Sequence, residues 1–203
     1  QETSGETYVS LNHSIPPDLI KNFNVVKANH RPYNIDTEFD KDTIKSLKSI
    51  VEEIKYHGEW SGFVNTLSMH YHHLNNLNNI PKDKYDVIFY LRSDIQMSQG
   101  EYDKLIDNVM NKEIKNNTIY VCKMNYKGVC DQYAYGDYDS MSKYLSAYSQ
   151  IPNFVSLYSQ IPNFVSLYSY IPKMMKENNI GFVNAERILE YYLNNVGLNV
   201  DIV

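Results

Sequence analysis

The stretch YDVIFYL, residues Tyr85 to Leu91, decides how the rest of this sequence is interpreted. It is a nearly continuous run of apolar and β-branched residues, with charged residues before it and Arg92 directly after it. Runs of this kind are typical of strands that are covered on both faces. We therefore predict a central strand over Tyr85 to Leu91, with Arg92 at its carboxyl end.

Predicted helices and strands alternate along the chain around this strand. Apolar residues recur every three or four positions in the helical segments, and short β-branched runs mark the strands. The expected strands are Glu6 to Leu11, Thr118 to Cys122 and Leu198 to Val203, and the expected helices are Asp40 to Tyr56, Gly58 to about Asn79, Tyr102 to Val109, Tyr138 to Tyr148 and Ala185 to Asn195. This order predicts an α/β fold, with a mostly parallel central sheet and helices on both of its faces.

Length and composition bound the class of protein. A chain of 203 residues with 43% hydrophobic residues is large enough for one substantial core, so we expect a single domain over residues 1–203. The net charge of −5 and the scattered basic residues argue against a nucleic-acid partner. No apolar run has the length of a transmembrane segment, and the first residues do not have the order of a signal peptide. These features predict a cytoplasmic protein in which Cys122 and Cys130 are reduced, while the oligomeric state is not indicated.

A tandem repeat occupies residues 143–172. Its copies are KYLSAYSQIP at Lys143 to Pro152, NFVSLYSQIP at Asn153 to Pro162 and NFVSLYSYIP at Asn163 to Pro172. Because proline disrupts a helix interior, we expect short helical turns joined at each proline rather than one long helix. Ten residues are too few for a solenoid unit, so an insertion that is neutral for function is favoured over a binding surface built from the repeat.

The residues that follow the predicted central strand form the first candidate site. Arg92 and Asp94 are two positions apart, so an extended backbone would direct both side chains to the same side. Ligands of open α/β sheets bind beyond the carboxyl ends of strands, where Arg can bind phosphate oxygens and Asp can hold a divalent metal. The alternative is a surface ion pair that caps the strand.

A second candidate site lies in the segment from Cys130 to Gly136. Asp131 could serve as a general base or orient an acceptor hydroxyl, and Gln132 lies beside it. The alternative is a turn whose Asp caps the next helix. Asp137 or Asp139 could provide that cap equally well, which would leave Asp131 for another role.

The densest group of histidines is His70, His72 and His73. On a helix, His70 and His73 lie one turn apart, near enough to share a metal ion. The sequence offers no identifiable third ligand, so histidines without a metal are favoured here.

Several short motifs occur in a characteristic order. They are NTLSMHY at Asn65 to Tyr71, YDVI and LRSDI within Tyr85 to Ile95, DQYAYG at Asp131 to Gly136 with Met141 and Tyr144 after it, and Ala185-Glu186 at the start of the last helix. The series resembles a family of glycosyltransferase-like proteins related to bacterial lipopolysaccharide and capsule synthesis enzymes. The resemblance extends from about Tyr8 to the C-terminus, apart from the repeat.

The resemblance implies a GT-A, Rossmann-like transferase that moves a sugar from a nucleotide-sugar donor to a glycan acceptor. Arg92-Ser93-Asp94 would take the place of the D-x-D element, with Arg92, Asp94 and Gln132 on the donor side. Asp94 would hold a divalent metal, manganese or magnesium, although one acid in place of two leaves metal dependence open. Asp131 and Glu186 would be the catalytic or site-lining acids.

One feature departs from the family pattern. Family members begin with a strand and a donor-binding loop, and this chain has no room for them before Tyr8. The sequence, which begins at Gln1, is therefore expected to be truncated, or to belong to a non-catalytic relative that binds through its tyrosine-rich repeat.

Overall fold

The structure is a computed structural model that describes residues 6–11, 25–30, 32–53, 55–92, 98–122, 128–150 and 184–203. The chain divides into two compact units. The first comprises Gln1–Ile80 and Leu145–Val183, and the second comprises Pro81–Tyr144 and Asn184–Val203. The single domain expected over residues 1–203 remains a prediction.

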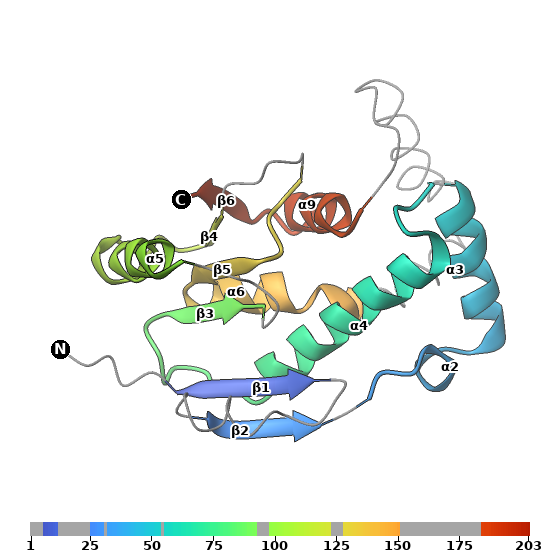
Figure 1. Cartoon of the computed structure of the whole chain (residues 1–203), viewed down its shortest axis with the longest axis horizontal. Coiled ribbons are helices and arrows are strands. Elements are labelled where there is room, and N and C mark those ends of the chain that lie inside the picture. Colours follow the sequence, from blue (N-terminus) through green and yellow to red (C-terminus); the bar gives the residue numbers. More distant parts are fainter. Residues whose placement is uncertain are drawn as a thin grey trace. The chain divides into compact units, whose positions relative to one another are not determined.

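The first unit combines a pair of strands with helices. Strands β1 (Thr7–Leu11) and β2 (Val25–His30) pair in parallel. The helices are α2 (Ile35–Glu38), α3 (Lys41–Glu53), α4 (Glu59–Leu77) and the short 3-10 helix η1 (Ala147–Gln150). The long helix α4 packs against β1, α3 and η1 (Figure 1). The helices expected over Asp40 to Tyr56 and from Gly58 to about Asn79 are thus present.

The core of the first unit forms between α3 and α4. Leu47, Ile50 and Val51, from the apolar stripe of α3, are buried. The ring of Tyr56 meets that of Phe63 edge-on, at a centroid distance of 5.3 Å. The buried side of α4 also carries polar residues, and one of them, Thr66, shares a hydrogen bond of 2.6 Å with the hydroxyl of Tyr56.

The second unit is built on a four-stranded sheet with the order β3-β5-β4-β6. Its strands are β3 (Ile88–Leu91), β4 (Thr118–Val121), β5 (Tyr133–Gly136) and β6 (Asn199–Ile202), and its helices are α5 (Gln99–Asn111), α6 (Tyr138–Leu145) and α9 (Ala185–Asn195). β5 runs antiparallel to both β3 and β4, whereas β4 and β6 are parallel.

The sheet corrects two predictions. It is mixed rather than mostly parallel, and among the described strands β3 lies at an edge rather than in the centre. The mixed character comes from β5, a four-residue strand that was predicted only as a site segment and that runs antiparallel to both of its neighbours. β3 lies at the edge because, among the described strands, only β5 pairs with it.

Helices pack against both faces of this sheet. On one face Leu105 of α5 lies against Tyr120 and Tyr135, whose rings stack at 5.0 Å. On the opposite face Gly136 lies close to Ser140 and Met141 of α6. The mixed α/β architecture predicted from the alternation of elements is therefore present in this unit.

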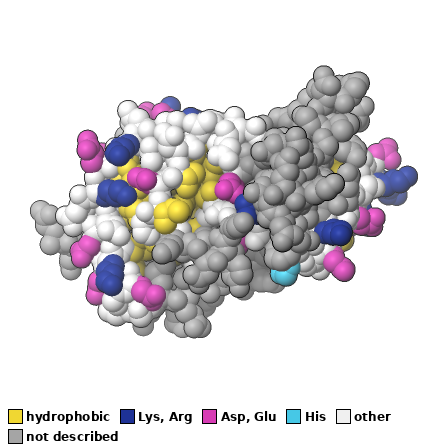
Figure 2. Space-filling view, turned by 90° about the horizontal axis from the view of Figure 1, so that it is seen from above, with side chains coloured by type: hydrophobic (Ala, Val, Ile, Leu, Met, Phe, Trp, Pro, Cys, Tyr) yellow, Lys and Arg dark blue, Asp and Glu magenta, His cyan; other side chains and the backbone are white. Residues whose placement is uncertain are grey.

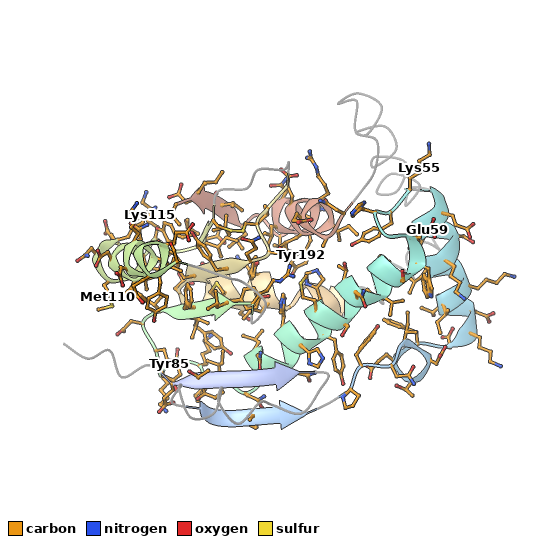
Figure 3. The ribbon with its side chains drawn as sticks, in the orientation of Figure 1. Lys55, Glu59, Tyr85, Met110, Lys115 and Tyr192 are labelled. Carbon is orange, nitrogen blue, oxygen red and sulfur yellow. A yellow bond between two sulfur atoms is a disulfide. The ribbon has the colours of Figure 1, made fainter. Side chains whose placement is uncertain are left out.

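The helix α9 is tied to α6 by a hydrogen bond. The hydroxyl of Tyr192, labelled in Figure 3, donates to the backbone carbonyl of Lys143 at 2.9 Å. Leu189 and Leu193 of α9 are buried in the same unit. The position of the start of α9, where Glu186 lies, is thus fixed by packing and by this bond.

The two cysteines form a disulfide, which corrects the prediction of reduced thiols. Cys122 directly follows β4 and Cys130 lies just before β5, so the pairing of these neighbouring strands brings the two residues together. Their Cα atoms are 5.7 Å apart, a separation that disulfides commonly span. Sequence spacing alone did not reveal this proximity because β5 was not predicted.

The surface carries mixed charges. Figure 2 shows one face of the molecule, on which the Lys and Arg side chains of described residues are interspersed with Asp and Glu side chains. Recognition of an anion on this face would depend on individual side chains rather than on a broad field of one sign. None of the described helices is both long enough and apolar enough to cross a membrane.

Candidate functional site

Arg92 and Asp131 form the centre of the candidate site in the second unit. The backbone N–H of Arg92 donates to the carbonyl of Gln132 at 3.0 Å, which extends the pairing of β3 with β5 by one residue. The guanidinium of Arg92 donates to the carboxylate of Asp131 at 2.9 Å. The Asp131 side chain is only 6% exposed, whereas that of Arg92 is 32% exposed. A buried carboxylate thus anchors a guanidinium that solvent can reach.

The residues Gly128 to Asp131, here called the Asp131 segment, are held by contacts on several sides. The N–H of Val129 donates to the carbonyl of Glu186 at 3.1 Å. Gly128 has a φ of 128°, and a Cβ at this position would lie 2.8 Å from the Cβ of Glu186. Only glycine readily allows both this conformation and this close approach. The start of α9 is therefore packed directly against the Asp131 segment.

Tyr144 supports the same segment from α6. Its hydroxyl donates to the carbonyl of Cys130 at 3.2 Å, and its side chain is fully buried. Burial raises the pKa of Tyr144 well above its usual value, and the nearby Tyr90 and Asp131 raise it further, while Arg92 opposes them. Tyr144 consequently remains protonated at neutral pH and stays a hydrogen-bond donor.

The antiparallel direction of β5 explains why these residues lie together. The carboxyl ends of β3 and β4 and the beginning of β5 meet at one end of the sheet. Arg92, Cys122 and Asp131 occupy those three strand ends. This end of the sheet therefore presents a cation, a carboxylate and a disulfide side by side.

The structure brings together four of the five site residues predicted from sequence. Arg92, Asp131 and Gln132 lie at adjoining strand ends, Gln132 being exposed, and Glu186 contacts the Asp131 segment through its backbone. Asp94, the predicted donor and metal residue, lies outside the described residues, as does Ser93. The predicted proximity of Asp94 to Asp131 therefore stays a prediction.

The alternative reading of Asp131 as a helix cap is resolved by Asp137. The Asp137 carboxylate accepts the N–H of Ser140 at 2.6 Å and so caps α6. Asp131 instead binds Arg92. Sequence reasoning missed the roles of Gly128 and Tyr144, although an isolated glycine near a predicted site is a recognisable signal of a close backbone approach.

The histidines of α4 belong to the first unit and form a buried group. The rings of His70 and His73 lie perpendicular, with centroids 5.4 Å apart. Burial lowers the pKa of His70 to about 4, so this imidazole is neutral at physiological pH. Among the described residues no group of three His, Cys, Asp or Glu side chains is arranged to hold a metal ion.

Comparisons with protein-family models, with curated proteins and with solved structures found no match to this chain. Any functional argument therefore depends on the motif series and on the geometry of the site.

Proposed function

We propose that the chain carries a glycosyltransferase site that moves a sugar from a nucleotide-sugar donor to a glycan acceptor, with Arg92 binding the donor diphosphate. The observation that carries this proposal is the ion pair in which buried Asp131 holds the solvent-accessible guanidinium of Arg92. The ordered motifs around both residues, in which the sequence resembles glycosyltransferase-like proteins, support the same function.

The chemistry of sugar transfer places a specific demand on such a cation. When the bond between the sugar and the diphosphate breaks, negative charge builds up on the departing phosphate oxygens. A pre-oriented guanidinium stabilises that charge without reorganising at the moment of reaction, and its planar donors match phosphate oxygens. Asp131, by fixing one side of Arg92, would supply this orientation.

The acids have distinct places in this proposal. Asp131 is buried and paired, so its first role is to position Arg92, and its predicted role as a general base stays to be tested by a pH profile. Glu186 is partly buried at the beginning of α9 and is proposed as the second site-lining acid. Gln132 is exposed beside Arg92 and is proposed to contact the donor sugar.

The predicted metal ion depends on Asp94. The described residues do not supply three suitable ligands, and Asp94 lies outside them. No step of this proposal therefore uses a metal ion, and binding of manganese or magnesium by Asp94 remains a prediction.

A thermal-shift panel tests the proposal. Nucleotide-sugars that bind the folded protein raise its melting temperature, and the panel is run with and without manganese. The shift should be lost in Arg92→Gln but kept in Lys104→Gln, which removes an exposed positive charge from α5. Release of the nucleoside diphosphate with a glycan acceptor then separates transfer from binding.

Two outcomes count against the enzyme. If no nucleotide-sugar raises the melting temperature, or if Arg92→Gln and Lys104→Gln behave alike, Arg92 is not a donor ligand. Binding without release of nucleoside diphosphate would favour the non-catalytic alternative.

A further inference from the structure

The Cys122–Cys130 disulfide adjoins the candidate site through the chain itself, because Cys130 directly precedes Asp131. Both cysteines are buried, with exposed fractions of 8% for Cys122 and 1% for Cys130. The chain contains only these two cysteines, so any thiol chemistry measured on the protein reports this pair.

At least four contacts between described residues restrain the Asp131 segment within the second unit. Val129 donates to the carbonyl of Glu186, and the carbonyl of Cys130 accepts from Tyr144. Asp131 pairs with Arg92, and Cys130 is bonded to Cys122 at the end of β4. Of these contacts, the disulfide is covalent, and its Cys130 directly precedes Asp131, whose carboxylate binds Arg92.

We propose that the Cys122–Cys130 disulfide is a redox-sensitive clamp that holds Asp131 in place against Arg92. Its opening requires a dithiol reductant. One thiolate of the reductant attacks a cysteine sulfur to form a mixed disulfide, and the second thiolate then displaces the protein sulfur. The reductant becomes a disulfide, and two electrons and two protons pass to Cys122 and Cys130, which become thiols.

Attack on the sulfur of Cys122 releases Cys130 as the thiolate, and attack on the sulfur of Cys130 releases Cys122. Either route leaves the cysteine next to Asp131 without its bond to the end of β4. Opening the bond removes the covalent link between the Asp131 segment and the end of β4.

The expected consequence is a loss of orientation rather than a loss of the fold. The contacts of Val129, Cys130 and Asp131 named above are, apart from the disulfide, hydrogen bonds and one ion pair, which permit small displacements. A guanidinium that must match phosphate oxygens is sensitive to displacements of about 1 Å. The consequence for ligand binding rests on the proposed function, whereas the clamp itself does not.

Amide exchange measured residue by residue by NMR tests the clamp directly. The compared samples are oxidised protein, protein reduced with dithiothreitol, and the Cys122→Ser/Cys130→Ser double variant. Thiol titration confirms that the oxidised wild type has no free thiol and that the reduced wild type has two. The amides of Val129 and Arg92 should exchange at least about tenfold faster in the two open forms. The amide of Leu198, which donates to Leu193 at 3.0 Å, should keep its rate.

Three results would overturn the clamp. The first is two free thiols in protein equilibrated with glutathione disulfide, because the bond would then not form. The second is unchanged exchange at Val129 and Arg92 after reduction. The third is a general loss of amide protection that includes Leu198 and occurs both in the reduced wild type and in the double variant. The disulfide would then support the whole unit rather than the Asp131 segment.

Titration with inorganic pyrophosphate adds the functional consequence. Oxidised protein should bind pyrophosphate about three to ten times more tightly than reduced protein, and Arg92→Gln should remove this difference. If exchange at Val129 and Arg92 responds to reduction but neither form binds pyrophosphate, the clamp is supported and the proposed function is contradicted.

Discussion

The guanidinium of Arg92 and the carboxylate of Asp131 lie 2.9 Å apart, although 39 positions separate the two residues in the chain. The pair joins the end of β3 to the beginning of β5, because these strands run antiparallel and their ends coincide. The same arrangement buries the Asp131 carboxylate and leaves part of the Arg92 side chain accessible to solvent. The site thus follows from strand pairing rather than from sequence proximity.

The first prediction concerns the energy of this pair. Arg92→Gln and Asp131→Asn should each destabilise the protein, Arg92→Gln by about 2–3 kcal/mol because it leaves a buried carboxylate without its cation. A double-mutant cycle, measured by urea unfolding, should give a coupling of about 1–2 kcal/mol, a value that allows for the partial exposure of Arg92.

The ion pair of Arg187 and Glu190 on α9 is the matched control. Its N–O distance is 3.0 Å, close to that of the site pair, but its carboxylate is 37% exposed. An equivalent cycle should give a coupling of only about 0.5 kcal/mol or less. Equal coupling in the two cycles would show that Asp131 gains nothing from its burial.

The second prediction concerns the close approach of Gly128 to Glu186. Gly128→Ala should cost about 2–4 kcal/mol, because the added Cβ would lie 2.8 Å from the Cβ of Glu186 and because φ is 128°. Gly100→Ala is the control. At Gly100 an added Cβ meets nothing within 4 Å, so alanine should be neutral or stabilise the helix by up to about 1 kcal/mol. Similar melting temperatures for the two variants would contradict the described packing of α9.

The third prediction is a loss of stability in acid caused by His70. Burial lowers its pKa from the usual 6.5 to about 4, so the unfolded chain binds a proton more readily than the folded chain. The contribution of neutral His70 to the free energy of unfolding is fully present above about pH 6.5. It decreases as the pH is lowered towards 4, by roughly 3 kcal/mol in total.

Urea unfolding at a series of pH values measures this dependence. His70→Leu should reduce the slope between pH 6.5 and 4, although His72, whose pKa is also lowered by burial, retains part of it. A slope in His70→Leu as steep as in the wild type would mean that His70 is not buried as a neutral group.

The fourth prediction concerns Tyr144. Tyr144→Phe removes the hydroxyl that donates to the carbonyl of Cys130 at 3.2 Å, so this carbonyl loses a donor in a buried setting. Chemical denaturation should show a loss of about 1–2 kcal/mol. Tyr102→Phe, at a residue that is 45% exposed on α5, should change stability by less than about 0.5 kcal/mol. A neutral Tyr144→Phe would indicate that water replaces the hydroxyl.

Helical periodicity made much of the fold predictable. The apolar stripe that includes Leu47, Ile50 and Val51 predicted the helix that the structure shows as α3. The segment from Ala185 to Asn195 forms α9 over the residues expected. These elements have long repeating patterns and recognisable ends, which local sequence determines well. Strands β2 and β5 were not predicted, since YAYG of β5 contains no β-branched residue and VVKANH of β2 has only two before it turns polar.

Missing β5 affected the larger predictions. The sheet was expected to be mostly parallel, and the cysteines were expected to be reduced, because nothing in the local sequence placed Tyr133–Gly136 between β3 and β4. The central position expected for β3 was a separate error, since among the described strands only β5 pairs with it. Arg92 and Asp131 nevertheless lie in direct contact. Arg92 and Asp131 were selected from separate segments by their chemistry and motifs, and their direct pairing depends on a strand register that sequence patterns do not encode locally.

The most direct test of the central claim is an NMR titration that follows the arginine side-chain Nε–Hε signals. The chain has only three arginines, Arg31, Arg92 and Arg187, so each signal can be assigned by single substitutions. Addition of a nucleotide-sugar that raises the melting temperature, or of inorganic pyrophosphate, should shift the Arg92 signal in a saturable way. The Arg187 signal should stay in place because its side chain is only 13% exposed, against 32% for Arg92, so a ligand has little access to its guanidinium. A ligand that binds while the Arg92 signal remains unmoved would contradict the proposal that Asp131 holds Arg92 for recognition of a diphosphate.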